Sequence, residues 1–194
     1  MKHLPCVQLR SARIPSIPGL IADHFWFVID KQGDFNKKDR WEVWQNRDCG
    51  GESWCYLHKN LKAYSDNVGT GKSKKIQEWY GEEAERLIIQ IENSVRNYPY
   101  QEKYRYWPGP NSNTYVQWIL EKSKIDYMLG SSAIGKDYLP RVFSFKKNRG
   151  YIQIASPIFG IKIKWLCLLE VHILTLSIGV CREPLRITIP LLRL

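Results

Sequence analysis

The sequence predicts an α+β fold in which an antiparallel β-sheet packs against two central helices. Two strand-like segments joined by a polar turn lie near the N-terminus, two segments with apolar residues at helical spacing follow, and the C-terminal part alternates again. Strands grouped before and after the helices are typical of α+β proteins. We therefore expect a single domain over residues 1–194, with an N-terminal hairpin at 6–46, central helices at 81–122 and a β-rich part at 150–194.

The N-terminal part is expected to contain three strands. The sequence alternates over Cys6–Ile14, is mostly apolar over Ala22–Asp30 and alternates strictly over Asp39–Asn46. The polar, glycine-containing segment between the second and third strands predicts a hairpin. Residues 48–71 are expected to form loops, with one short strand around Trp54–Leu57.

Two helices are predicted in the centre of the chain. Gly81–Asn97 carries one apolar stripe and two glutamates in its first turn, where the helix dipole favours negative charge. A shorter amphipathic run predicts a second helix over Ser112–Lys122, directly after a loop that is rich in proline and aromatic residues.

The C-terminal part is expected to form β-structure. Its longest apolar run, over residues 165–180, is interrupted by Glu170 and His172, so it is too short and too polar for a membrane span and suits paired strands. The expected segments are Tyr151–Ala155, Phe159–Trp165, Cys167–Ser177 and a tail at Arg186–Leu194.

The net charge of +10 favours an acidic partner, either nucleic acid or an anionic membrane surface. The basic residues are scattered, and the densest groups, at residues 72–75 and 146–149, resemble solvated loops. No base-reading motif accompanies the charge. We therefore expect no specific recognition of nucleic acid, and an anionic membrane surface stays open as a partner.

The five cysteines are odd in number, and their spacings match neither a zinc site nor a redox motif. They are expected to be free thiols, which favours a reducing compartment. The first residues lack the apolar run of a signal peptide. We expect a cytoplasmic protein, with a position at the periphery of a membrane as an alternative, and neither a metal ion nor a cofactor.

Ser112 is the candidate nucleophile, within the segment Trp107–Val116 (Trp-Pro-Gly-Pro-Asn-Ser-Asn-Thr-Tyr-Val). Its hydroxyl is expected at or beside a helix N-terminus, where the field is positive and free backbone N–H groups can stabilise an oxyanion. Asn111 and Asn113 are candidate oxyanion donors, and Trp107 is a candidate wall of a substrate cleft. The alternative is that Ser112 only caps the helix.

His24 is the candidate general base. It lies within an apolar strand, where an unpaired polar group is costly, so it is expected to have a partner. The hairpin places positions 42–46 opposite His24, and Glu42 is the ionisable residue in that window. A carboxylate on an imidazole fixes its tautomer and raises its basicity. His24, Glu42 and Ser112 therefore form a candidate catalytic triad, and the alternative is a structural His–Glu pair.

A further polar cluster follows the second predicted helix, at Gly135-Lys136-Asp137. Lys136, with Asp137 beside it, is a candidate for binding an anionic group of a substrate. The alternative is a turn with solvated charges.

Two loops carry a resemblance to a known family. The segments Arg96–Val116 and Ser132–Pro140, with the strand that contains His24 and the strand that contains Trp41 and Trp44, resemble the bacterial family of domain of unknown function 3750. This resemblance covers most of the chain, and the family name implies no activity.

A more distant similarity is to permuted NlpC-like papain-fold enzymes, which include relatives of lecithin–retinol acyltransferase. His24–Val28 matches their His-aromatic-x-hydrophobic strand, and Asn111–Val116 matches their Asn-Cys-x-x-Phe-Val helix start. This resemblance implies a permuted papain-like arrangement with His24 as base, Ser112 at the position of the cysteine and Glu42 as the third polar residue. Because a hydroxyl needs a stronger base than a thiol, the replacement implies a slower hydrolase or a fold kept for binding.

Three functional hypotheses follow. The first is a divergent papain-like hydrolase or acyltransferase that acts on an amide or ester bond of a peptide, a peptidoglycan fragment or a lipid. The second is a catalytically inactive binding module that uses the same cleft. The third is a membrane-surface protein that docks on anionic lipid through its positive charge and its apolar C-terminus, Leu185–Leu194.

Overall fold

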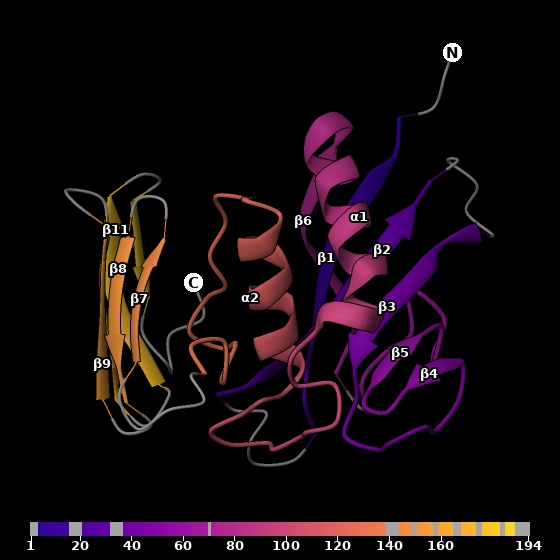
Figure 1. The fold of residues 1–194 in the computed structure, drawn as a ribbon, viewed down its shortest axis with the longest axis horizontal. Coiled ribbons are helices and arrows are strands. Elements are labelled where there is room, and N and C mark those ends of the chain that lie inside the picture. The colour runs from indigo at the N-terminus through magenta and orange to yellow at the C-terminus, as the bar shows by residue number, and fades with distance from the viewer. Residues whose placement is uncertain are drawn as a thin grey trace.

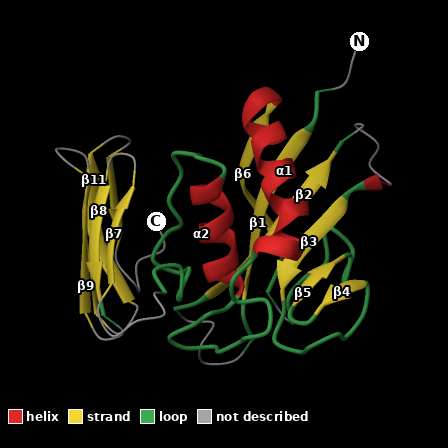
Figure 2. Ribbon diagram, viewed as in Figure 1, coloured by secondary structure: helices red, strands yellow, loops and turns green. Residues whose placement is uncertain are grey.

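The computed structural model describes residues 4–15, 21–31, 37–69, 71–138, 144–148, 151–156, 159–164, 168–173, 176–182 and 185–188. Within these residues the chain forms two six-stranded antiparallel sheets and two helices (Figures 1 and 2). This architecture confirms the predicted α+β class, although the strands divide between two sheets.

The first sheet has the strand order β4-β5-β3-β2-β1-β6. Its strands are β1 (Cys6–Arg13), β2 (Asp23–Asp30), β3 (Asp39–Val43), β4 (Glu52–Trp54), β5 (Leu57–Lys59) and β6 (Lys74–Tyr80). The three predicted N-terminal strands are confirmed, and the third ends at Val43 instead of Asn46.

Two local predictions in this part of the chain are wrong. The short strand expected around Trp54–Leu57 is instead the turn between β4 and β5, with Cys55 at a φ of 57°. The lysines expected in a solvated loop at residues 72–75 partly belong to β6. β6 pairs with β1 at the edge of the sheet, where charged residues are common because one side of the strand faces solvent.

Two helices, α1 (Gly81–Asn97) and α2 (Ser112–Lys122), cover one face of the first sheet, and both were predicted with these bounds. They bury apolar side chains of β1, β2 and β3 in the main core. Figure 1 shows α2 between the two sheets, which explains why eight of its eleven residues are buried. Neither helix in the described part of the chain is both long and apolar enough to cross a membrane.

A smaller core lies on the other face of the first sheet, around Trp26 and Val28 of β2 and Val68 of the loop between β5 and β6. Because side chains alternate along a strand, His24 belongs to this second face. His24 is the second residue of β2, so it lies at the end of the sheet and close to the start of α2.

The second sheet is a meander in which sequential strands pair, in the order β12-β11-β10-β9-β8-β7. Its strands are β7 (Ser144–Asn148), β8 (Tyr151–Ala155), β9 (Phe159–Lys164), β10 (Leu168–Ile173), β11 (Leu176–Arg182) and β12 (Leu185–Thr188). In Figure 1 this sheet stands on the far side of α2 from the first sheet.

The predicted C-terminal segments are confirmed in part. Strands at 151–155 and from 159 onward are present, but the single strand expected over Cys167–Ser177 is wrong, because β10 and β11 divide this segment. β7 includes Lys146 and Lys147, which were expected in a solvated loop. Residues 149, 165–167, 174–175 and 189–194 of the predicted segments lie outside the described residues.

Candidate active site

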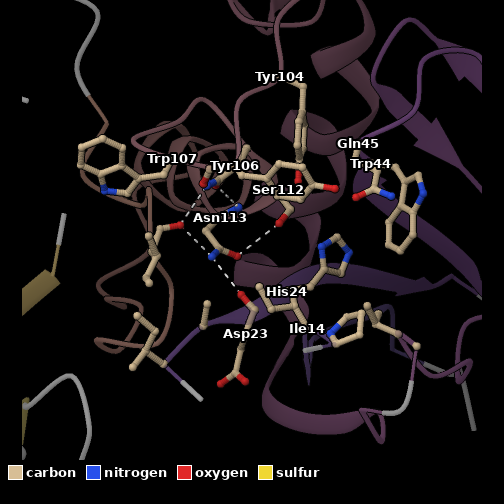
Figure 3. A pocket seen from close by; sticks show the side chains of 17 residues that line it. Ile14, Asp23, His24, Trp44, Gln45, Tyr104, Tyr106, Trp107, Ser112 and Asn113 are labelled. Carbon is tan, nitrogen blue, oxygen red and sulfur yellow. Dashed lines mark hydrogen bonds between the residues drawn. The ribbon is translucent and has the colours of Figure 1, made fainter. Parts of the chain in front are cut away.

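A cavity of about 760 Å³ lies where β2 and α2 begin. Three predicted site residues from the first two residues of β2 and α2 line this cavity: His24, Ser112 and Asn113. Trp107 and Asn111 line it as well. Figure 3 shows the His24 ring and the Ser112 side chain at this cavity. The fold therefore brings together residues that are 88 positions apart in the chain.

Asn111, rather than Ser112, caps α2. Its Oδ1 accepts hydrogen bonds from the N–H groups of Asn113 (3.0 Å) and Thr114 (3.2 Å), and Thr114 Oγ1 accepts from the Asn111 N–H. This reciprocal pair is a capping box that fixes the helix start. The alternative in which Ser112 only caps the helix is therefore wrong. Ser112 is the first helical residue, and its hydroxyl is not needed for capping.

The loop at Gly135 supports this cap. Asn111 Nδ2 donates to the carbonyl groups of Tyr106 and Ile134, which ties the cap to two loops. A Cβ atom at Gly135 would lie 2.3 Å from Asn111 Nδ2, and Gly135 has a φ of +90°, so glycine is required there. The Asn111 side chain is thus bonded to its own helix start, to the preceding loop and to the distant Ile134, so it has a structural role.

Asn113 connects α2 to β2 around His24. Its Oδ1 accepts from the Phe25 N–H (3.2 Å), and its Nδ2 donates to the Asp23 carbonyl (3.0 Å) and to the Ile134 carbonyl (2.9 Å). The residues on both sides of His24 are therefore bonded to the residue that follows Ser112. This clamp holds the His24 backbone beside the start of α2.

His24 forms the expected pair with Glu42. His24 Nε2 and Glu42 Oε2 are 2.8 Å apart, and both side chains are buried. The His24 ring also contacts Trp26 and Trp44, with ring centroids 5.6 Å and 5.1 Å away. These contacts fix the orientation of the imidazole.

Arg40 completes this group, although the sequence analysis did not select it. Arg40 Nη2 donates to Glu42 Oε2 at 2.7 Å, and the guanidinium lies 4.1 Å from the ring centroid of Trp26. Arg40 and Glu42 are two apart on β3 and so share one face of the strand, next to His24. This spacing of two residues could have identified Arg40 from the sequence as a neighbour of Glu42.

The charges of this group favour an ionised Glu42. Burial opposes ionisation of the Glu42 carboxyl, but its contacts with His24 and Arg40 outweigh burial and place its pKa below the usual value for Glu. An ionised carboxylate only accepts hydrogen bonds, so the Nε2 of a neutral His24 donates to it. The remaining ring nitrogen, Nδ1, is then unprotonated and can act as a base.

Ser112 and His24 are not hydrogen-bonded to each other in the described residues. Ser112 Oγ instead donates a long bond, 3.4 Å, to Asn113 Oδ1. Catalytic hydrogen bonds are often long or poorly aligned without substrate and tighten when it binds, so this geometry is compatible with a nucleophilic role.

The predicted oxyanion donors are corrected by the structure. The side-chain amides of Asn111 and Asn113 are both engaged with backbone groups, so neither has an N–H left for a substrate. The backbone N–H of Ser112 remains as a candidate donor. It is the first of α2, it has no acceptor among the described residues, and it lies at the positive end of the helix dipole.

Aromatic and aliphatic side chains form most of the cavity wall. Trp107, Tyr104 and Tyr106 form one side, and the Tyr104 and Tyr106 rings meet edge to face at 5.3 Å. Trp44 and Gln45, which the sequence analysis did not select, also line the cavity. The wall suits a substrate with a bulky apolar part, and Gln45 supplies a polar contact.

Residues 5–138 match the model of the family described as "Protein of unknown function (DUF3750)". The chain belongs to this family. No curated protein and no solved structure matches the chain. Every residue that lines the cavity lies within the matched range of the DUF3750 family, whereas the second sheet follows that range.

Lys136 and Asp137 lie in the family-matched range but not at the cavity. Lys136 Nζ bonds Asp137 and Glu170, and Lys162 Nζ bonds Asp137, each at 2.5 Å. Ser177 Oγ donates to Asp137 at 3.2 Å. All five side chains are buried, so this ion cluster attaches the second sheet to the loop after α2 instead of facing a substrate.

The ion cluster keeps its charges although it is buried. Burial opposes ionisation of Asp137, yet Lys136 and Lys162 hold its pKa well below the usual value. The pKa of Lys162 is raised, because Asp137 and Glu170 outweigh the effect of burial. No group of three or more His, Cys, Asp or Glu side chains among the described residues is arranged to hold a metal ion.

Proposed function

We propose that this DUF3750 protein hydrolyses an amide or ester bond, or transfers its acyl group, at the cavity where β2 and α2 begin. Ser112 is the proposed nucleophile, His24 the general base and Glu42 the residue that orients His24. One observation carries the proposal: Asn113 bonds the backbone on both sides of His24 while Asn111 caps the helix, so a hydroxyl that is not used for capping and an oriented imidazole share one cavity.

The proposed reaction has two steps. His24 Nδ1 takes the proton from Ser112 Oγ as this oxygen attacks the carbonyl carbon, and the carbonyl oxygen becomes an oxyanion beside the Ser112 N–H. Glu42 stabilises the imidazolium. The imidazolium then gives its proton to the leaving amine or alcohol. Water, or a second alcohol or amine, attacks the acyl-serine in the same way and releases the product.

The similarity to permuted NlpC-like papain-fold enzymes supports this assignment, since the His strand and the nucleophile helix match in order and type. The buried Glu42 supports His24 as the base, because a carboxylate bonded to Nε2 fixes the tautomer and the orientation of the imidazole. The apolar wall supports an acyl or aromatic group in the substrate, which a peptide, a peptidoglycan fragment or a lipid can supply. The free thiols Cys6, Cys49 and Cys55 support a cytoplasmic site of action.

A binding module is the second candidate. It is favoured by the bond from Ser112 Oγ to Asn113, which leaves the hydroxyl without a contact to His24. Under this alternative the cavity would bind a ligand of the same chemistry without turnover.

A fluorophosphonate probe distinguishes the two candidates, because it reacts with a serine only where the hydroxyl is activated. We expect labelling and hydrolysis of p-nitrophenyl esters by the natural chain, and loss of both in Ser112→Ala. Ser112→Cys should keep or raise ester turnover, since a thiol is partly ionised near neutral pH. Ser53→Ala is the matched control, because Ser53 Oγ lies 2.8 Å from His58 Nδ1 but outside the cavity.

The outcomes separate clearly. Labelling that is lost in Ser112→Ala and kept in Ser53→Ala supports catalysis. Absence of labelling and turnover in the natural chain, with ligand binding in the cavity, would leave only the binding module.

A further inference from the structure

The second sheet has its polar face inside and its apolar face outside. On the covered face, side chains from four neighbouring strands are 2% exposed or less: Gln153, Lys162, Glu170, His172 and Ser177. In most sheets with one solvated face the pattern is the reverse, because the apolar side chains are buried. The inverted pattern indicates that the outer face of this sheet meets something other than water.

Apolar side chains cover the outer face of the sheet. Ten of the sixteen large hydrophobic side chains that are exposed in the described residues lie here, each between 44% and 67% exposed. They are Phe145, Ile152, Ile154, Phe159, Ile163, Leu169, Ile173, Ile178, Val180 and Ile187.

The strand register joins these side chains into rows that run across the sheet. In one row each residue is the register partner of the next on the neighbouring strand: Ile152, Ile163, Leu169, Val180 and Ile187. A second row runs through Phe145, Ile154, Ile161, Val171 and Ile178. Six strands spaced about 4.8 Å apart make this face roughly 24 Å wide. A continuous apolar patch of this kind marks a binding surface.

The charge of the sheet region indicates what binds there. Residues 139–194 contain nine Lys and Arg against two Glu, so this segment carries +7 of the net charge of +10. Lys147 and Arg182 are exposed and lie on the outer face itself, in register with Ile152 and Leu185. They flank the apolar rows on opposite sides of the sheet.

This charge pattern separates two possible occupants. A second copy of the chain would bring the same positive charges face to face, which is unfavourable. An anionic bilayer surface offers lipid phosphates to Lys147 and Arg182 and an apolar boundary to the rows between them.

We propose that the outer face of the second sheet docks on anionic lipid membranes. The apolar rows enter the boundary between headgroups and acyl chains, and the flanking cations contact lipid phosphates. The buried ion cluster of Lys136, Asp137, Lys162 and Glu170 attaches the opposite face of the sheet to the loop after α2, which leaves the apolar face exposed. This proposal rests on the second sheet and is independent of the catalytic proposal.

Co-flotation of the full chain with lipid vesicles tests the proposal. We expect binding to mixed phosphatidylcholine–phosphatidylglycerol vesicles, weaker binding to phosphatidylcholine vesicles, and a partial loss of binding as salt screens the charges. Leu169→Glu and Ile178→Glu, made separately, should each weaken binding by about tenfold or more, because each removes an apolar side chain and adds a negative charge. Ile89→Glu is the matched control, since Ile89 is equally exposed but lies on α1.

Circular dichroism and sedimentation of the same proteins complete the test. Both variants should keep the folded spectrum, because the replaced side chains are exposed. Failure of the natural chain to bind anionic vesicles, or equal loss of binding in Ile89→Glu, would overturn the proposal. A dimer without vesicles that Leu169→Glu converts to a monomer would overturn it in favour of self-association.

Discussion

Replacing Asn113 tests whether one side chain couples α2 to β2 at the candidate active site. Asn113→Ala removes the acceptor of the Phe25 N–H and the donor to the carbonyl groups of Asp23 and Ile134. The helix start itself is kept, because Asn111 still caps it through the backbone N–H groups of residues 113 and 114.

The expected loss of stability follows from the three bonds. Asn113 is 4% exposed, so water does not easily replace its amide, and three backbone groups lose a partner. A net contribution of about 1 kcal/mol for each bond gives a loss of about 3 kcal/mol in the free energy of unfolding. Asn113→Asp should cost at least as much, because it places a carboxylate against the Asp23 and Ile134 carbonyl groups.

Urea unfolding followed by tryptophan fluorescence measures this loss, and fluorophosphonate labelling measures the effect on Ser112. Gln117→Ala is the matched control. Gln117 is also buried on α2, but within the described part of the chain its amide bonds only Glu121 of the same helix, so we expect a loss of about 1 kcal/mol or less. An Asn113→Ala protein that is as stable as the Gln117→Ala protein and labels at the natural rate would refute the coupling.

Two further predictions concern buried charges. Glu42→Gln should lower stability at neutral pH, and the difference from the natural chain should shrink as acid protonates Glu42, because a depressed pKa gives stability that is lost as the pH falls through the folded-state value. Urea unfolding at a series of pH values measures this. Asp137→Asn should cost about 3–5 kcal/mol, because it leaves the buried Lys136 and Lys162 poorly paired, and hydrogen exchange should rise in β9 to β11.

Each of these predictions has a control substitution. For Asp137→Asn the control is Lys164→Met, which breaks the exposed pair of Lys164 with Asp126 and should cost less than about 1 kcal/mol. For Glu42→Gln the control is Asp39→Asn, since Asp39 is on the same strand but only partly buried. A constant difference between Glu42→Gln and the natural chain across acid pH, or equal effects of Asp137→Asn and Lys164→Met, would contradict the account of these charges.

The sequence predicted those features that depend on local patterns. Alternation located β1 and the start of β3, a mostly apolar run located β2, and helical spacing located α1 and α2 with their observed bounds. The hairpin register placed Glu42 near His24, and the structure contains this pair. These features depend on residues that are close in sequence or that belong to one hairpin.

The remaining features depend on contacts between distant segments. The clamp by Asn113 joins residues that are 88 to 90 positions apart, so no local pattern indicates that its amide is occupied. From the sequence, Lys136 and Asp137 were predicted to form a solvated turn or an anion site. The sequence does not show that Lys162 and Glu170 of the second sheet form ion pairs with them. A charged residue with a distant partner and one that faces solvent look the same in a single sequence.

The catalytic proposal and the docking proposal concern different parts of the chain, and together they suggest why both parts are present. The cavity lies wholly within the range that matches the DUF3750 family, whereas the apolar face and most of the net charge lie in the segment that follows. A protein held at a bilayer meets lipid-borne acyl groups at a high effective concentration, because its search is confined to a surface. A slow serine nucleophile would gain most from such confinement. Loss of docking in Leu169→Glu should therefore slow turnover of an acyl lipid in vesicles and leave turnover of a soluble ester unchanged.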